Sequence, residues 1–265
     1  MNIVDTESLL SVPLTIKSHN GCNIGTATGF FWRKSDGKTY LVSNYHNFSG
    51  NHFSTGASMY KDSAFPAKID YPRFIPQQSL HERQIHSITL CDEAGNDPVW
   101  KMHPIHDTRK IDIAIVEVPT IADDQTYVCA VNDEPLRECD KQLQRYRPGF
   151  ELMISGFLLK DRPTGYFPIH IRGFVASEMD ALYHGKPAFL MDAHTSSGMS
   201  GSPVFATGLE QVEPGKKFSP FKLVPPFVGI YSGRIIEHEN GIKRELQVGI
   251  VWRRQLILET VEYST

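Results

Sequence analysis

The chain contains 265 residues, of which 40% are hydrophobic and 22% are charged, and its formal net charge is −3. This length allows one large all-β unit or two small ones that share a core, and the composition is typical of a globular protein. The near-neutral charge gives no sign of the basic surface that binds nucleic acid, and no hydrophobic run approaches the roughly 20 residues of a membrane-spanning helix. We therefore expect neither nucleic acid nor a membrane as a partner.

The N-terminal segment and the cysteines both favour a cytoplasmic protein. The first residues, MNIVDTESLL, carry acidic side chains and lack the basic start and long hydrophobic stretch of a signal peptide. No two cysteines form a C-x-x-C pair, so the sequence predicts reduced thiols rather than disulfides or a metal site. The cysteines are Cys22, Cys91, Cys129 and Cys139.

Short segments rich in β-branched and aromatic residues recur along the chain, with Gly, Pro and Asp between them. In chain order, the predicted strands cover residues 28–32, 39–44, 87–92, 111–118, 151–157, 169–175, 189–193, 203–207, 227–232 and 247–252. Many short strands with few helical patterns predict an all-β protein, either a sandwich or a pair of barrels.

The remaining segments contain two helical patterns and three irregular stretches. Residues 253–262 have helical spacing of hydrophobic side chains and predict a C-terminal helix, and residues 79–85 form a weaker candidate. Residues 123–149 are polar and irregular, as expected of a connection between two halves. Residues 49–86 and 208–226 read as long surface loops, which in a compact domain are usually functional or mobile.

The segment SSGMSGSPVF, residues 196–205, has the composition of a catalytic serine turn. Gly198 and Gly201 flank Ser200 and permit a tight turn that exposes its hydroxyl group, and Pro203 then begins a strand. A turn that merely connects two strands would have the same composition, so this segment alone leaves both interpretations open.

A histidine and an aspartate elsewhere in the chain suit the same chemistry. The strand in TYLVSNYHNF runs into His46, and in IDIAIVEV the side chains of Ile111, Ile113 and Ile115 share one face while Asp112 lies on the other. A carboxylate at the start of so hydrophobic a strand is costly to bury without a partner, and the N–H of a catalytic histidine is one such partner. A structural histidine and a solvated aspartate remain the alternatives.

These residues follow one another in the order His46, Asp112, Ser200, which is the chymotrypsin order; subtilisins and α/β-hydrolases use others. The local sequences are similar as well. LVSNYH resembles the LVTAAH-type segment of trypsin-like serine peptidases, IDIAIVEV resembles their DIAL strand, and GMSGSPVF resembles their G-D-S-G-G-P motif. The similarity extends from GTATGFF, residues 25–31, to the C-terminal VGIVW and its helix, and so covers nearly the whole chain.

The resemblance implies an all-β, chymotrypsin-like fold of two six-stranded antiparallel β-barrels packed side by side, with a C-terminal helix. The first barrel would carry the histidine and the aspartate, and the second would carry the serine. The implied domains are an N-terminal barrel over residues 1–122, an inter-barrel connection over residues 123–149, and a C-terminal barrel with the helix over residues 150–265.

The resemblance further implies a serine endopeptidase that acts on protein or peptide substrates. Ser200 would attack the scissile carbonyl, His46 would take its proton, and Asp112 would orient the imidazole. The backbone N–H groups of Gly198 and Ser200 would form the oxyanion hole. This chemistry uses only protein groups, so no cofactor is expected.

Within this family, the branch that the chain most resembles is that of the bacterial glutamyl endopeptidases, which share the S-G-S-P-V-F form. Two residues depart from the patterns of relatives: Tyr231 stands where those enzymes carry a histidine, and Met199 stands where digestive trypsins carry an aspartate. The resemblance places six residues at the primary specificity pocket, namely His194, Thr195, Tyr231, Ser232, Gly233 and Arg234.

The pocket residues predict which side chain is accepted. His194 stands where basic specificity needs a carboxylate, so cleavage after Lys or Arg is not expected. His194, Thr195 and Arg234 favour an acidic or small polar side chain first and a medium-sized apolar one second. A pocket that is simply small or apolar, with His194 and Arg234 in solvent, is the alternative.

Other interpretations of the sequence are weaker. His103 and His106 have a spacing that suits a metal site, yet Pro104 separates them and no further ligands complete a set, so surface residues are the simpler interpretation. An α/β-hydrolase needs G-x-S-x-G, but Ser202 occupies the last position and only His238 follows the nucleophile.

The main rival comes from a different class of protein: a trypsin-like fold that acts as a binding or scaffolding module, with latent or lost catalysis. The three catalytic positions are all intact, which favours the enzyme. An intracellular endopeptidase must also be restrained or selective, and a regulatory protein partner is one means of control that the sequence leaves open.

Overall fold

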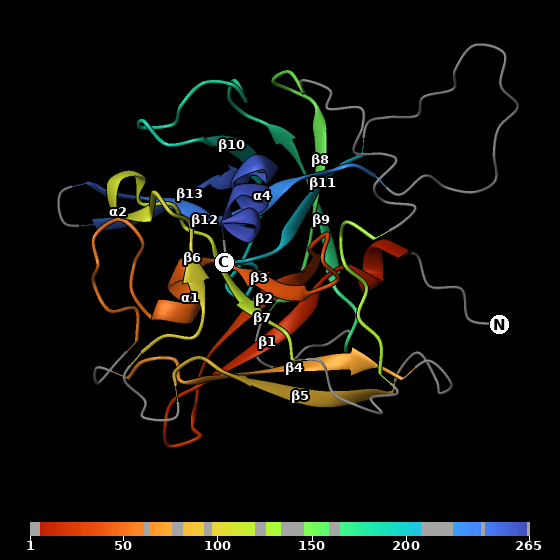
Figure 1. Ribbon diagram of the computed structural model, residues 1–265. Coiled ribbons are helices and arrows are strands. Elements are labelled where there is room, and N and C mark those ends of the chain that lie inside the picture. Colours follow the sequence, from red (N-terminus) through yellow and green to blue (C-terminus); the bar gives the residue numbers. More distant parts are fainter. Residues whose placement is uncertain are drawn as a thin grey trace, which may run out of the picture.

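The computed structural model describes residues 6–60, 64–75, 82–92, 97–119, 126–133, 146–158, 165–207, 225–239 and 242–263. Within these ranges the chain forms two groups of antiparallel strands, with a helix near the C-terminus (Figure 1). The first half of the chain builds one group and the second half builds the other.

The first group is a seven-stranded sheet with the strand order β5-β4-β1-β2-β3-β7-β6. Its strands are β1 (Val12–Lys17), β2 (Asn23–Arg33), β3 (Thr39–Ser43), β4 (Lys68–Phe74), β5 (Arg83–Thr89), β6 (Lys101–Met102) and β7 (Ala114–Glu117). The short helical segments of this half are the 3-10 turn η1 (Thr6–Leu9), α1 (Tyr45–Ser49) and α2 (His106–Arg109).

The second group is a closed six-stranded barrel with the strand order β10-β13-β12-β11-β8-β9. Its strands are β8 (Glu151–Gly156), β9 (Ile169–Val175), β10 (Ala188–Ala193), β11 (Pro203–Ala206), β12 (Phe227–Glu239) and β13 (Ile242–Arg253). The chain then continues directly into the helix α4 (Arg254–Glu262).

The predicted all-β class and the C-terminal helix are confirmed, and so is a six-stranded barrel in the second half. In the first half the described strands form a seven-stranded sheet, one strand more than expected. Most of the predicted connection over residues 123–149, and nearly all of the predicted loop over residues 208–226, lie outside the described residues.

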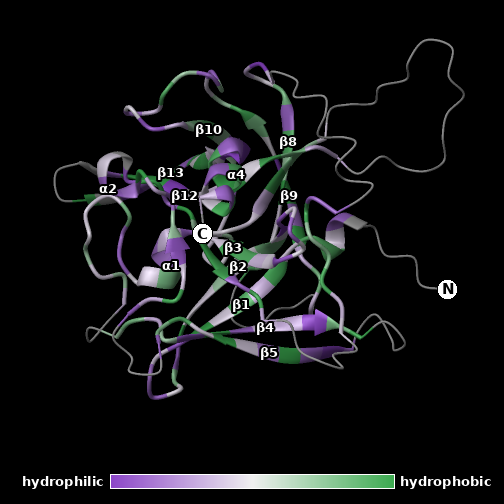
Figure 2. Cartoon of the chain, in the orientation of Figure 1, coloured by the Kyte–Doolittle hydropathy of each residue, from purple (hydrophilic) through white to green (hydrophobic). Residues whose placement is uncertain are grey.

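Two predictions for the first half were wrong. Residues 83–85 of the helical candidate 79–85 belong to β5, and the segment 49–86 is more than a surface loop, because it also contains β4 and the start of β5. These two strands pair along their whole length, from Lys68 opposite Thr89 to Phe74 opposite Arg83. Both colours of the hydropathy scale occur along them, as expected of a sheet with one buried face (Figure 2).

Three hydrophobic clusters stabilise the two groups: one in the first sheet, one inside the barrel and one that joins residues of both. The strand β7 and the residue before it contribute to two of them. Ile113 and Ile115 lie in the shared cluster, whereas Ala114 and Val116 lie in the cluster of the first sheet. The segment that carries Asp112 is therefore fixed from both faces, which positions the candidate site at the junction of the two groups.

Two sequence expectations can be compared with the described residues. None of the helices there has both the length and the hydrophobicity to cross a lipid bilayer. Cys22, Cys91 and Cys129 are free; the sequence led us to expect partly buried thiols, and Cys91 and Cys129 are half-buried whereas Cys22 is exposed. Cys139 lies outside the described residues.

Candidate active site

His46 lies in the single turn of α1, directly after β3, and is held there by Asp112. The backbone N–H of His46 donates to Oδ1 of Asp112 over 3.0 Å, and its ring Nδ1 lies 2.8 Å from Oδ2. Because an ionised carboxylate can only accept, Nδ1 carries the proton and Nε2 is left as a base. Asn44, which precedes the helix, donates from Nδ2 to the backbone carbonyl of Asp112 over 2.8 Å.

Asp112 is completely buried, with 0% of its surface exposed. Burial by itself would raise its pKa, but the charge of His46 and the hydrogen bonds from His46 and Ser232 outweigh this effect and hold the pKa below the usual value of a carboxyl group. The hydroxyl of Ser232, in β12, donates to Oδ2 of Asp112. Asp112 is therefore a carboxylate at neutral pH, with donors from both groups of strands.

Two further histidines lie in the segment before β7, and one of them, His106, contacts the neighbours of the pair. His106 donates from Nδ1 to the carbonyl oxygen of Ile111 over 2.6 Å, and its ring stacks on Tyr45 with the centroids 4.1 Å apart. His103 places Nε2 3.0 Å from Oε2 of Glu259 in α4. Their interpretation as surface residues was wrong: they are only 3% and 4% exposed, because these bonds turn both rings inward.

The turn between β10 and β11 carries Ser200 and is fixed against the first sheet. Gly198 and Gly201 have φ angles of 98° and 89°, in the left-handed region that glycine adopts without strain. The backbone N–H of Thr28, in β2, donates to the carbonyl of Ser200 over 2.9 Å, and Oγ1 of Thr28 donates to the carbonyl of Gly198 over 2.8 Å. Thr28 of the first sheet thus positions the serine turn of the barrel.

Ser232 links Ser200 to Asp112, a role that the sequence did not predict. The hydroxyl of Ser200 donates to the backbone carbonyl of Ser232 over 2.9 Å, while the hydroxyl of Ser232 contacts Asp112. Among the contacts described, no hydrogen bond joins Ser200 to His46. The resemblance had placed Ser232 at the specificity pocket, and its only signal in the sequence was a polar residue within a hydrophobic strand.

The backbone N–H groups of Gly198 and Ser200 are available to an acceptor. Neither donates a hydrogen bond to any residue that the structure describes. The turn at Ser200 is closed by other amides: the N–H of Gly201 donates to the carbonyl of Tyr231 over 2.9 Å, and that of Ser202 donates to Met199 over 3.1 Å. The two N–H groups that the sequence predicted as oxyanion donors therefore have no backbone partner among the described residues.

Thr195, in the segment before the serine turn, and Tyr231, in β12, are in contact with each other. Their hydroxyl oxygens are 2.5 Å apart, and the residues are 2% and 1% exposed. The ring of Tyr231 packs over Gly249 of β13, where any Cβ would overlap it. Burial raises the pKa of Tyr231, so the phenol stays protonated at neutral pH.

The other predicted pocket residues bring no unpaired positive charge to this space. His194 is exposed. Arg234 forms a 2.6 Å ion pair with Glu245 of β13. Gly233 faces the serine, since a Cβ at this position would lie 3.9 Å from Oγ of Ser200. The expectation that His194 and Arg234 supply positive charge to the pocket is thus not supported by their contacts.

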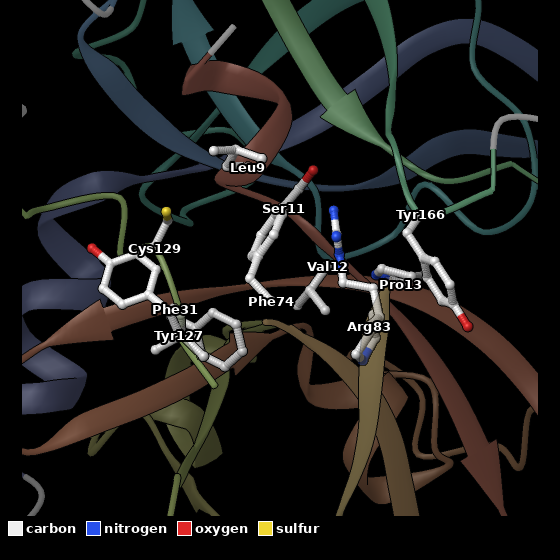
Figure 3. A pocket seen from close by; sticks show the side chains of 12 residues that line it. Leu9, Ser11, Val12, Pro13, Phe31, Phe74, Arg83, Tyr127, Cys129 and Tyr166 are labelled. Carbon is white, nitrogen blue, oxygen red and sulfur yellow. The ribbon is translucent and has the colours of Figure 1, made fainter. Parts of the chain in front are cut away.

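Figure 3 shows a hollow elsewhere in the molecule. It is lined by residues of the first sheet and of neighbouring segments, among them Arg83, Tyr127, Cys129 and Tyr166. Its volume of about 10 Å³ holds no more than a single water molecule. None of the candidate catalytic residues lines it. No cluster of three His, Cys, Asp or Glu side chains that could bind a metal occurs in the described parts of the chain.

The closed barrel, the second sheet and the C-terminal helix together define a chymotrypsin-like fold. Among solved structures, the MamO protease domain from Magnetospirillum magneticum (apo form) is similar, with a TM-score of 0.52, 16% identity and coverage of 97% of both chains. Rv3671c from M. tuberculosis H37Rv, as a mutant in an inactive form, reaches a TM-score of 0.47 at 12% identity and 97% and 88% coverage. Deg5 reaches 0.48 at 15% identity, also with 97% and 88% coverage.

No protein-family profile matches the chain, and no curated protein sequence matches it. Of these three structures, MamO has a TM-score above 0.5, and at 16% identity its likeness supports the fold alone. The activity has to be argued from the geometry of the site.

We predict that Gly201→Ala strongly destabilises the protein, whereas Gly37→Ala does so mildly. Both glycines have φ near +90°, but a Cβ on Gly201 would overlap the carbonyl of Thr28 and the hydroxyl of Ser43, and nothing lies within 4 Å of one on Gly37. A left-handed alanine costs about 1–2 kcal/mol, and the overlap should bring the loss for Gly201→Ala to about 3–5 kcal/mol. Urea unfolding measures both; equal losses would contradict the predicted contact.

Proposed function

We propose that this protein is a serine endopeptidase that hydrolyses peptide bonds of protein substrates through an acyl-enzyme intermediate. The proposal rests on the two hydrogen bonds that the buried carboxylate of Asp112 accepts from His46, one from its backbone N–H and one from Nδ1. These bonds fix one tautomer of the imidazole and leave Nε2 as a base. They lie beside a glycine-flanked turn that presents Ser200.

In the proposed reaction, Oγ of Ser200 attacks the carbonyl carbon of the scissile bond and its proton passes to Nε2 of His46. The imidazolium then protonates the leaving amine, and the C–N bond breaks to give an acyl-enzyme. Water attacks the ester, again with His46 as the base, and releases the new carboxyl terminus. Asp112 stays ionised throughout and stabilises the imidazolium.

The negative charge that develops on the carbonyl oxygen needs donors already in place. The free N–H groups of Gly198 and Ser200 are suited to this role, because they lie on the turn that carries the nucleophile. A single donor of this kind is worth roughly 10²–10³-fold in rate in other serine proteases.

One contact favours the rival function, a catalytically latent binding module. The hydroxyl of Ser200 donates to the carbonyl of Ser232 and not to His46. Attack requires rotation about the Cα–Cβ bond of Ser200 from one staggered position to another, which is a small change for this half-buried hydroxyl. Hydrogen bonds of this kind are often absent before substrate binds, so we favour the enzyme.

We predict that Ser200→Ala, His46→Ala and Asp112→Asn each lose nearly all peptidase activity, by about 10⁴-fold. All three act in one proton-transfer sequence, so the Ser200→Ala, His46→Ala double variant should be hardly slower than the slower single variant. Hydrolysis of a protein substrate such as casein, followed with unfolding curves as the folding control, measures the effect.

A fluorophosphonate probe separates the two functions. An active enzyme forms a covalent bond between the phosphorus of the probe and Oγ of Ser200, whereas a latent module remains unlabelled. Labelling of wild type that disappears in Ser200→Ala supports the peptidase. Normal turnover of substrate by folded Ser200→Ala protein would contradict the peptidase proposal.

For the substrate, we propose a small side chain at the residue whose carbonyl is attacked. That side chain enters between the segment before Ser200 and β12, where Tyr231 and Thr195 are bonded to each other and buried. With this space filled and with Arg234 paired to Glu245, neither a long nor a charged side chain fits. Gly, Ala and Ser remain.

We predict that Tyr231→Ala shifts cleavage from small towards larger apolar residues such as Leu. Removing the ring opens the space over Gly249 to a larger substrate side chain. Contacts of this kind in an apolar pocket change selectivity by about 10–200-fold. Tyr231→Phe, which keeps the ring, is the matched control and should keep the small-residue preference. Cleavage-site profiling on a peptide library measures it, and wild-type cleavage after Phe or Arg would show the pocket argument to be wrong.

A cytoplasmic location and control by a partner protein are also part of the proposal. The free thiols of Cys22, Cys91 and Cys129 are consistent with a reducing compartment. The partner rests only on the need to restrain a protease inside a cell.

A further inference from the structure

The loop after α1 crosses from the first sheet towards the barrel and is closed by its own hydrogen bonds. Asn51 pairs with Ser58 as an isolated bridge, and the N–H of His52 donates to the carbonyl of Ala57 over 2.8 Å. The N–H of Gly56 donates back to the carbonyl of His52 over the same distance. These bonds fix the backbone at the tip of the loop.

The ring of His52 is oriented by this loop. Its Nδ1 accepts hydrogen bonds from the backbone N–H groups of Ser54 and Thr55, each over 3.3 Å. An accepting Nδ1 leaves the proton on Nε2, which has no partner among the described residues. His52 therefore presents one free N–H donor.

The next residue, Phe53, joins the loop to the barrel. The ring of His52 stacks on Phe53 with centroids 4.9 Å apart, and Phe53 meets Trp252 edge-on at 5.6 Å. On the barrel side, Nζ of Lys186 lies 4.9 Å from the centroid of Phe53. A neutral donor and an ammonium group thus both lie against the ring of Phe53.

The charge of Asp112 acts on both polar groups of this cluster. Burial lowers the pKa of His52 and of Lys186, and in each case the carboxylate of Asp112 acts in the opposite direction. No acidic residue within the described ranges forms an ion pair with either. His52 is therefore neutral at pH 7.5, and Lys186 is a partly buried cation without an anionic partner.

We infer that His52 and Lys186 form a binding site for an acidic side chain of the substrate, a few residues from the bond that is cut. The ammonium of Lys186 and the Nε2–H of His52 would each donate to one oxygen of a carboxylate. The inference rests on the proposed peptidase function, since it assigns the cluster to that substrate. The preferred substrate would then have a small residue in the primary pocket, at the bond that is cut, and an acidic residue bound outside that pocket.

The surface beside the cluster offers room for the rest of such a peptide. Pro187 and Arg253, the residues that follow Lys186 and Trp252, both line a hollow of about 250 Å³. Its wall is completed by residues of α4 and by Ile105, which is 43% exposed. A peptide bound at Lys186 can therefore continue along a concave, mostly apolar surface.

The test uses Ser200→Ala protein, so that binding is measured without cleavage. Its probes are capped pentapeptides of alanine in which a single glutamate is moved from the first position to the last, each with a glutamine counterpart. NMR titration gives the dissociation constants and, from the ring signal of His52, its pKa with and without peptide. Lys186→Met is the test variant, Lys186→Arg restores the charge, and Lys34→Met, in the turn between β2 and β3, is the matched control.

We expect at least one glutamate peptide to bind about tenfold more tightly than its glutamine counterpart and to raise the pKa of His52. Lys186→Met should remove this preference, whereas Lys186→Arg and Lys34→Met should keep it. Equal binding of every glutamate and glutamine pair, or a preference that survives in Lys186→Met, overturns the inference. If the site binds as expected but wild type cleaves no peptide, the peptidase proposal fails and the acidic-peptide site stands.

Discussion

The carboxylate of Asp112 has no exposed surface, and much of the candidate site is arranged around its charge. Leaving a buried charge unpaired costs several kcal/mol, so its oxygens require donors with good geometry. Those donors come from both groups of strands: His46 from the first sheet and Ser232 from the barrel. The ion that orients the imidazole is thus also an attachment between the two halves, and orientation of His46 depends on correct docking of the barrel.

The same dependence holds for the nucleophile turn. Ser200 belongs to the barrel by sequence, yet its carbonyl is bound by Thr28 of the first sheet, and Gly201 has no Cβ because the same strand occupies that space. Met199, at the position where the resemblance would place the aspartate of digestive trypsins, is fully buried in the hydrophobic cluster of the barrel. The turn is therefore supported by apolar packing within the barrel and by hydrogen bonds to the first sheet, and none of the ion pairs between described residues involves it.

The sequence predicted those features that depend on local pattern. The alternation of Ile113 and Ile115 with Ala114 and Val116, and the spacing of the C-terminal helix, are readable from neighbouring residues alone. It missed β1 and β4, which contain Pro13 and Pro72, because a proline removes a donor and argues against a strand. Pro13 lies in the register of β1 with β2 and Pro72 in that of β4 with β5, but both prolines lie outside the short stretch over which β1 and β4 pair with each other, 15–17 with 68–70. Each proline therefore has one side without a paired strand, where a missing N–H donor costs little.

The features that the sequence did not predict depend on residues far apart in the chain. The bond from Ser232 to Asp112 joins residues 120 positions apart, and the bond from His103 to Glu259 joins residues 156 apart. No local pattern contains such information. This is also why the candidate triad could be named from three short segments, whereas the contacts that support it had to come from the structure.

The residues that carry positive charge near the site were easier to name from the sequence than to place. The sequence assigned positive charge to the primary pocket through His194 and Arg234, but a cation that already has a carboxylate partner offers little to a second one. Arg234 forms an ion pair with Glu245, and His194 is exposed to solvent. Lys186 differs from both, because it is partly desolvated and its ammonium lies over an aromatic ring, that of Phe53. A desolvated ammonium gains more from a carboxylate than a solvated one does, since water competes less for it. An acidic group on the substrate therefore has more to gain beside Phe53 than in a pocket closed by Tyr231.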